Sequence, residues 1–481
     1  MYRNRCVVSV LAISFALTGC ASLNFKPEPT KVDVLAELNA EVPPPAKWVV
    51  PAPDALPSTD WVRAFPDPIL IELVDEALRE NTDIGVAYAR LEASIARETF
   101  SRADRLPSVT GRAGLSRTER SNEFIPDTTG MSTSLTASWE PDLWGRISDN
   151  INAAEVESEA LAADIAAARL SITGQVAQGW FRLIEARLLA NLSERDIETK
   201  ERALRLTQRR FESGVSESSD VRLARSSLAQ AKSLQASRQQ RLAAFARQIE
   251  ILLARYPASA LQAAVDLPDL PPLTGAAAPS YILTQRPDLI AAERRLAGQG
   301  IEIDLARKAL MPSLSLSGSP SASGTGFDSF FDIDALVANI AANLTAPIFQ
   351  GGRLRANVDV QEAVLKQQLQ SYVGTVLGAY RDVEDALDGE ARLAESEAAL
   401  RIAVEESLKA EERLELRYTE GLASILQLLD AQSRRISAEG QLISARAERL
   451  QNRVRLHVAL GGGAYGDVPP DALPAFLRDQ G

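Results

Sequence analysis

The feature that most limits the fold of this chain is a pair of very long segments without proline, 147–212 and 354–419, each of 66 residues. As a continuous α-helix, either segment would reach about 100 Å, because each residue adds about 1.5 Å. In both, Ala and Leu recur at three- and four-residue spacing with Arg, Glu and Gln between them, which is typical of coiled-coil packing. Aromatic residues make up only 5% of the chain. The sequence therefore predicts long, closely packed helices.

Four other segments alternate apolar and polar residues with a period of two: 106–119, 131–141, 312–323 and 335–348. In the second of them, for example, Leu135 and Ala137 flank Thr136. This pattern over about ten residues is typical of a membrane barrel strand, which turns apolar side chains to lipid and polar ones to the lumen. For any single segment, a half-buried strand of a soluble sheet is the alternative interpretation.

Four strands are too few to close a barrel, and open sheet edges are not tolerated in lipid. Several copies of the chain must therefore share one barrel if these segments span a membrane. The strand pattern thus predicts a homo-oligomer.

The chain repeats its order of elements at an offset of about 205–207 residues. Leu106-Pro107-Ser108 corresponds to Met311-Pro312-Ser313. Arg210-Phe211 corresponds to Arg417-Tyr418, and in both of these a glycine follows three residues after the aromatic residue. We expect a first repeat at 61–270, with a helix, strands 106–119 and 131–141, a long helix 147–212 and a helix 218–256. We expect a second repeat at 271–465, with a helix 286–309, strands 312–323 and 335–348, a long helix 354–419 and a helix 424–460. We expect residues 466–481 to form a C-terminal tail.

The N-terminus reads as an export signal. Arg3 and Arg5 precede an apolar run over 7–17, which is too short to span a bilayer but suits a signal peptide covering 1–19. The run ends in Leu17-Thr18-Gly19-Cys20, which resembles a bacterial lipobox with Cys20 as the lipidated residue. An ordinary signal peptide with a chance cysteine is the alternative. Ala21, where an aspartate would retain a lipoprotein in the inner membrane, fits sorting to the outer membrane.

Residues 20–60 are expected to form a lipid-anchored extended arm that lies along a partner surface. Eight prolines fall within 21–60, and no periodicity is sustained there. No run of about eighteen apolar residues follows Cys20, so we expect no transmembrane helix.

The composition argues against two classes of function. Acidic residues outnumber basic ones, 64 to 52, for a net charge of −12, whereas a nucleic-acid binder usually presents a basic surface. One histidine, His457, and two cysteines, Cys6 and Cys20, leave little for metal ligation or nucleophilic catalysis. We expect no enzyme activity and no cofactor besides the covalent lipid on Cys20.

Several motifs, taken in their order along the chain, resemble those of the TolC-type outer-membrane efflux family in its lipoprotein branch. The segment 286–296, RPDLIAAERRL, is close to a signature of that branch, and 311–318, MPSLSLSG, also matches it. Further matches are found at 139–146, 383–387, 429–432 and 459–463. Together they extend over nearly all of the chain beyond the signal.

The resemblance implies a mainly α-helical chain with four membrane β-strands. Three chains would form a twelve-stranded barrel in the outer membrane of a Gram-negative bacterium, continued by a twelve-helix periplasmic tunnel. It further implies a passive, gated conduit of a tripartite system that exports small molecules such as drugs. The partners would be a periplasmic adaptor protein and an inner-membrane pump of the RND type.

Two tight turns would lie at the periplasmic end of the helices. They are Gly214-Val215-Ser216 and Gly421-Leu422-Ala423-Ser424, where glycine permits the positive φ that such a reversal needs. The resemblance adds a second role for these tips, which is docking of the adaptor.

The resemblance also places a gate just inside the tips. The paired gate acids of the family fall on Gln427 and Asp430, so only the inner position is acidic here. Three copies of Asp430 around one axis would repel one another and attract cations, although a solvated surface acid is the alternative.

Some members of the family close the tunnel with an inter-helix network. Its aspartate falls on Asp220 and its tyrosine on Tyr418, but its arginine position is Ala423. Arg210 or Arg417 could substitute, unless these are only cations that favour a helix C-terminus.

Two alternatives to small-molecule efflux stay open at this point. One is the outer-membrane conduit of a type I polypeptide secretion system, which has the same architecture. The other is a lipoprotein scaffold without a channel that links the envelope layers by its coiled coils, which leaves the four alternating strands unexplained.

Overall fold

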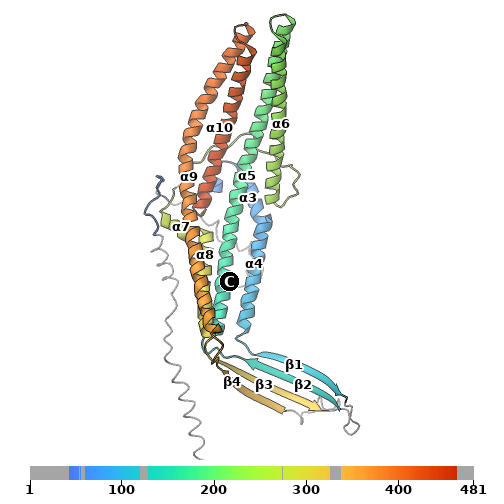
Figure 1. The fold of residues 1–481 in the computed structure, drawn as a ribbon, viewed down its shortest axis with the longest axis vertical. Coiled ribbons are helices and arrows are strands. Elements are labelled where there is room, and N and C mark those ends of the chain that lie inside the picture. The colour runs from blue at the N-terminus through green and yellow to red at the C-terminus, as the bar shows by residue number, and fades with distance from the viewer. Residues whose placement is uncertain are drawn as a thin grey trace, which may run out of the picture.

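The computed structural model describes residues 43–53, 55, 60–119, 128–273, 275–324 and 337–462. The expected signal peptide, Cys20 and the tail 466–481 lie outside these ranges. Figure 1 shows an elongated molecule with a β-sheet at one end and two helical hairpins that reach the other end. Short helices pack beside the hairpins between the two ends.

Two very long helices, α5 (Arg146–Glu212) and α9 (Arg353–Thr419), run from the sheet to the far tips. Each has 67 residues and is therefore about 100 Å long. Gly145 and Gly352, with φ of 74° and 84°, precede them and turn the chain out of the sheet. The backbone returns from the tips in α6 (Ser218–Leu252) and α10 (Ile425–Ala459).

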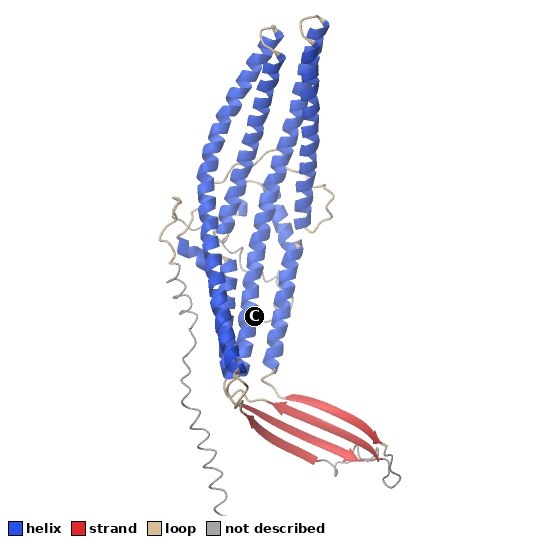
Figure 2. Ribbon diagram, in the orientation of Figure 1, coloured by secondary structure: helices blue, strands red, loops and turns tan. Residues whose placement is uncertain are grey.

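The sheet consists of β1 (Ser108–Thr118), β2 (Thr128–Trp139), β3 (Ser313–Gly324) and β4 (Val337–Thr345). The strands lie in the order β1-β2-β3-β4, and all neighbours are antiparallel (Figure 2). The four strands predicted from the alternating segments are thus confirmed. The outer strands, β1 and β4, leave two edges of the sheet without a partner within the described part of the chain.

The register puts apolar residues opposite one another across all four strands. Val109 lies opposite Ala137, Ala137 opposite Gly318, and Gly318 opposite Ile340. Opposed residues in antiparallel strands project from the same face, and on this face Val109 is 66% and Ile340 93% exposed. One face of the sheet is therefore apolar and uncovered by the other described residues.

The adjacent row belongs to the other face and is polar. Ser108 lies opposite Ser138, which lies opposite Ser317, and the hydroxyls of Ser108 and Ser138 are 2.8 Å apart. The sheet therefore separates an apolar from a hydroxyl-rich surface, as the period of two predicts.

The first repeat contains one more helix than the sequence indicated. A short 3-10 turn, η2 (Val62–Ala64), is followed by α3 (Pro68–Glu80) and α4 (Thr82–Ala103) instead of a single helix. The break falls at Asn81, whose side chain accepts hydrogen bonds from the backbone of Asp83 and Ile84 and so caps α4. The amide of Asn81 also donates to the carbonyl of Leu252 at 2.8 Å, which fixes the break against α6.

The second repeat also begins with two helices. A short α7 (Pro279–Gln285), which the periodicity had not indicated, precedes α8 (Pro287–Lys308). Pro287 occupies the first turn of α8, where its missing N–H leaves no hydrogen bond unmade.

The core lies level with these short helices. Trp61, Trp180 and Phe181 are fully buried in one apolar cluster, and the indole of Trp180 donates to Asp67 at 2.7 Å. A second cluster forms where α8, α9 and the end of α10 meet, around Val383. Within the described residues, no helix is both long and apolar enough to cross a membrane.

The described part of the N-terminal arm lies against the second repeat of its own chain. The carboxylate of Glu384 accepts hydrogen bonds from the backbone of Val49 at 2.7 Å and Val50 at 3.2 Å. The indole of Trp48 donates to the carbonyl of Ala277 at 2.8 Å. Residues 48–50 of the arm are therefore bound by the second repeat of their own chain.

Candidate functional site

The candidate site is the end of the two hairpins that lies farthest from the sheet. In the first tip, Gly214 has φ of 75°, and the N–H of Val215 donates back to the carbonyl of Arg210 at 2.9 Å. The hydroxyl of Ser216 donates to Asp220 at 2.6 Å, and Asp220 also forms a capping box with Glu217. Asp220, predicted to belong to a gate network, is thus bound inside its own hairpin.

The second tip repeats this construction. Gly421 has φ of 83°, and the N–H of Leu422 donates to the carbonyl of Arg417 at 2.8 Å. Ser424 caps α10 and forms a reciprocal pair with Gln427, with backbone-to-side-chain distances of 3.0 and 3.3 Å. The side chain of Gln427, a predicted gate residue, therefore stabilises the start of α10.

Large apolar side chains remain exposed at both tips. Val215 is 63% exposed in the first tip, and Leu422 and Leu426 are each 64% exposed in the second. Phe211 and Leu416 extend this surface along the ends of the long helices.

The two hairpins are joined near the tips through Tyr418. Its hydroxyl, which is buried, lies 2.9 Å from the hydroxyl of Thr207 on α5. The guanidinium of Arg210 lies 4.9 Å from the centre of the Tyr418 ring and donates to the Tyr418 carbonyl at 2.7 Å. Of the two arginines considered as substitutes at the predicted lock, Arg210 connects α5 with α9. Arg417 donates instead within its own hairpin, to the carbonyl of Leu422.

Ala423, at the family's arginine position, has an apolar role in this chain. It packs against a small buried cluster formed by Tyr418, Ile425, Leu428 and Leu429. The predicted lock residues Asp220 and Tyr418 therefore do not form one network. Tyr418 contacts the other hairpin, whereas Asp220 accepts hydrogen bonds from Ser216 and Glu217 of its own hairpin.

Asp430, the remaining predicted gate residue, lies on the surface of the isolated chain. Its side chain is 59% exposed and accepts a hydrogen bond from the guanidinium of Arg434 at 2.8 Å. Arg434 itself is 76% exposed and lies one helical turn further from the tip. This partner was not predicted from the sequence, although the spacing of four residues could have indicated it.

A buried charged layer, also missed, connects the hairpins behind the tips. Lys200 on α5 donates to Gln432 on α10 at 3.2 Å. Arg435 on α10 is paired with Glu411 on α9 and with Glu439 on its own helix. The available signal was spacing, because Gln432 and Arg435 share a helix face with buried Leu428 and must therefore be buried themselves.

Asp196 adds an acid to this layer without joining its hydrogen bonds. It is 6% exposed, and within the described structure its Oδ1 has no hydrogen-bond partner. Burial raises the pKa of Asp196 above its ordinary value, although the cations Lys200, Arg435 and Arg238 oppose this shift. Burial also disfavours the charged form of Lys200 and therefore lowers the pKa of Lys200.

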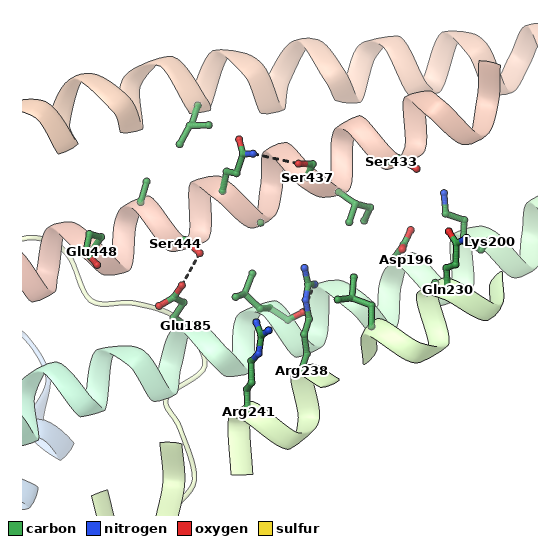
Figure 3. A pocket seen from close by; sticks show the side chains of 18 of the residues that line it. Glu185, Asp196, Lys200, Gln230, Arg238, Arg241, Ser433, Ser437, Ser444 and Glu448 are labelled. Carbon is green, nitrogen blue, oxygen red and sulfur yellow. Dashed lines mark hydrogen bonds between the residues drawn. The ribbon is translucent and has the colours of Figure 1, made fainter. Parts of the chain in front are cut away.

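Asp196 and Lys200 line an open cavity of about 940 Å³ between the two hairpins. Figure 3 shows both side chains extending from α5 toward α10, with Gln230 of α6 beside them and Arg238 and Arg241 of α6 further along the cavity toward Glu185. At the other end of the cavity Glu185 accepts a hydrogen bond from Ser444 at 2.6 Å. The lining combines apolar side chains, such as Leu189 and Ile436, with charged groups of both signs, so this part of the boundary between the hairpins is mixed rather than purely apolar.

Comparison with known proteins identifies this architecture. The family described as "Outer membrane efflux protein" matches residues 73–255 and 278–462. The pyoverdine export outer membrane protein OpmQ of Pseudomonas putida is 29% identical over 96% of this chain and 98% of its own. The outer membrane protein OprJ of Pseudomonas aeruginosa is 31% identical over 85% of this chain and 87% of its own.

A solved structure shows the same fold. The open-state crystal structure of the MtrE outer membrane channel of Neisseria gonorrhoeae aligns with a TM-score of 0.76 and 29% sequence identity. The alignment covers 88% of this chain and 97% of that one. The similarity therefore extends from the sheet to the hairpin tips.

Proposed function

This chain belongs to the outer membrane efflux protein family and is an outer-membrane efflux channel, and we propose that it acts as a homotrimer in a tripartite pump. In that assembly three four-stranded sheets form one twelve-stranded barrel in the outer membrane. The six hairpins form a tunnel through the periplasm. Substrates pass through it without chemical change, so the chain works as a passive conduit and has no catalytic role.

The observation that carries a barrel shared between chains is the combination of two open sheet edges with an uncovered apolar face. Among the described residues, β1 and β4 have no partner on their outer sides, and unpaired backbone groups cannot face lipid. β4 of one copy must therefore pair with β1 of the next. Because β1 and β4 are antiparallel to their neighbours, this closure continues the alternation around a barrel with an even number of strands.

The membrane boundary is supported by aromatic side chains where the sheet meets the helices. Trp139 and Trp144 are 40% and 43% exposed, and their indole groups donate to the carbonyls of Arg105 and Pro312. Partly exposed tryptophans are typical of a membrane–water interface. Lipidation of Cys20 would add a second attachment to the same membrane.

The proposed partners are a periplasmic adaptor and an inner-membrane pump of the RND type. The exposed apolar side chains of Val215, Leu422 and Leu426 offer the adaptor a surface at the tips. Among the relatives, OpmQ is named for pyoverdine export and SrpC of Pseudomonas putida as a solvent efflux pump outer membrane protein. These names support small molecules as the class of substrate. Neither name favours polypeptide secretion or a scaffold without a channel.

The adaptor proposal is tested by export from living cells. The chain and its cognate pump are expressed in a Gram-negative strain that lacks its own outer-membrane efflux channels, and accumulation of a fluorescent dye is measured. Leu422→Asp should restore dye accumulation while trimer abundance in the outer membrane stays unchanged. Val265→Asp is the matched control, because Val265 is also well exposed but lies in the loop after α6. Unimpaired export by Leu422→Asp would contradict tip docking.

A further inference from the structure

The exposed face of α10 carries very little charge. Between Leu426 and Gln441 its exposed positions follow one helical stripe, and only two of them are charged. These two are Asp430 and Arg434, and they have opposite sign. The full set of exposed positions is Leu426, Gln427, Asp430, Ser433, Arg434, Ser437 and Gln441.

Arg434 differs from the arginine beside it. Arg435 is buried and fully engaged with Glu411 and Glu439 in the layer between the hairpins. Arg434 lies about 100° away around the helix, on its exposed face, and contacts the carboxylate of Asp430 through Nε at 2.8 Å. Only Arg434 can therefore place a positive charge on the exposed stripe.

We propose that Arg434 determines the ion selectivity of the tunnel at its tip by neutralising Asp430. This inference rests on the proposed function, in which three copies of the α10 stripe face one axis. Three Asp430 carboxylates then form an acidic ring, and three Arg434 guanidinium groups form a basic ring next to it. The two backbone positions are about 6 Å apart along the helix, and the charged groups themselves are in contact at 2.8 Å.

The spacing of the rings decides their combined effect. The charged groups of the two rings are in contact, well within the Debye length of about 8 Å at physiological ionic strength, so an ion entering the tip experiences both at once. Gln427 adds no charge. The constriction is therefore close to neutral and selects weakly between anions and cations, whereas an unpaired Asp430 ring would select cations.

The role of Arg434 is electrostatic rather than structural. Both members of the pair are more than half exposed, and exposed pairs contribute at most about 1 kcal/mol to stability. Arg434→Gln should therefore leave the trimer intact, which separates a change of selectivity from a failure to fold.

The test is the reversal potential of purified channels in planar bilayers under a potassium chloride gradient. Arg434→Gln should raise the cation-to-anion permeability ratio severalfold, and Asp430→Asn should lower it. The double variant should return to the wild-type value. Lys409→Gln is the matched control, because Lys409 is an exposed cation at a similar distance from the tip on α9, where it is paired with Glu405 and Glu406.

Two results would overturn the inference in different ways. Channels whose permeability ratio is the same in Arg434→Gln and wild type would exclude a role of Arg434 in selectivity and leave the proposed function standing. Absence of channels from the wild-type protein would remove the proposed function and this inference with it.

Discussion

The guanidinium of Arg210 lies over the ring of Tyr418, 4.9 Å from its centre, and donates a hydrogen bond to the carbonyl of the same residue. Arg210 lies in the last turn of α5, two residues from its end, and Tyr418 is the penultimate residue of α9. The two contacts therefore hold the ends of the two long helices together at the tip.

Removing the contacts between Arg210 and Tyr418 should allow the tip ends of α5 and α9 to separate more easily. Arg210→Gln deletes a cation–π contact, which contributes about 0.5–2 kcal/mol, and also a charge-assisted hydrogen bond. We expect a higher mean conductance or a longer open time in planar bilayers. Arg417→Gln serves as the control, since Arg417 donates inside its own hairpin. Identical single-channel records for the two variants would argue against this role of Arg210.

The buried layer behind the tip should matter more for stability than the surface pair next to it. Arg435→Met leaves the carboxylates of Glu411 and Glu439 without their shared cation, and Glu411 is 6% exposed. Breaking such a pair from one side costs about 3–5 kcal/mol. The thermal midpoint of the purified protein should therefore fall clearly for Arg435→Met and hardly at all for Arg434→Gln. Equal midpoints would contradict the assignment of Arg435 to the buried layer.

His457 should make stability depend on pH. Its ring is buried and stacked on Trp61 with a centroid distance of 5.3 Å. Burial, and second the Arg453 guanidinium, lower the pKa of His457 from 6.5 to about 4. Between pH 6.5 and about pH 4, His457 is therefore protonated in the unfolded chain but neutral in the folded chain. The free energy of unfolding is unaffected by this group above pH 6.5 and falls by about 3 kcal/mol by pH 4.

The variant His457→Phe keeps an aromatic ring against Trp61 and removes the titration. The difference in thermal midpoint between wild type and variant should grow as the pH is lowered from 7 to 4.5. Glu185 and Asp196, whose pKa values are raised chiefly by burial, act in the opposite direction, but they are the same in both proteins. Parallel curves for the two proteins would refute the prediction.

The N-terminal arm should detach when Gly275 acquires a side chain. A Cβ at Gly275 would overlap the backbone carbonyl of Ala55, and the adjacent Ala276 donates to the carbonyl of Pro53 at 3.0 Å. Gly275→Ala should therefore increase limited proteolysis within 43–53. Gly85→Ala is the control, because a Cβ there meets no atom within 4 Å. Unchanged protection in Gly275→Ala would mean that the arm is held elsewhere.

Elements that depend on local periodicity could be predicted from the sequence. The alternation around Ala137 placed β2, and the lack of proline in 147–212 predicted a single helix where the structure has α5. The break at Asn81 was missed because it depends partly on a contact with Leu252, 171 residues away. No local pattern contains that information.

The tips show the same division. The glycines of both tips could be identified, because a tight reversal requires positive φ at Gly214 and Gly421. The bond from Lys200 to Gln432 joins residues 232 apart, and it depends on how α10 packs on α5. The pair of Asp430 and Arg434 follows a local spacing of four residues and could be predicted from the sequence, but the resemblance implied only Gln427 and Asp430 as gate residues and not Arg434.

A barrel that is shared between chains and forms a pore is the central claim. The decisive measurement is planar-bilayer conductance of the detergent-extracted protein, with the mass of the same particle determined by light scattering. We predict discrete channels from a particle with the mass of three chains. A monomer that produces no conductance under the same conditions would contradict the claim.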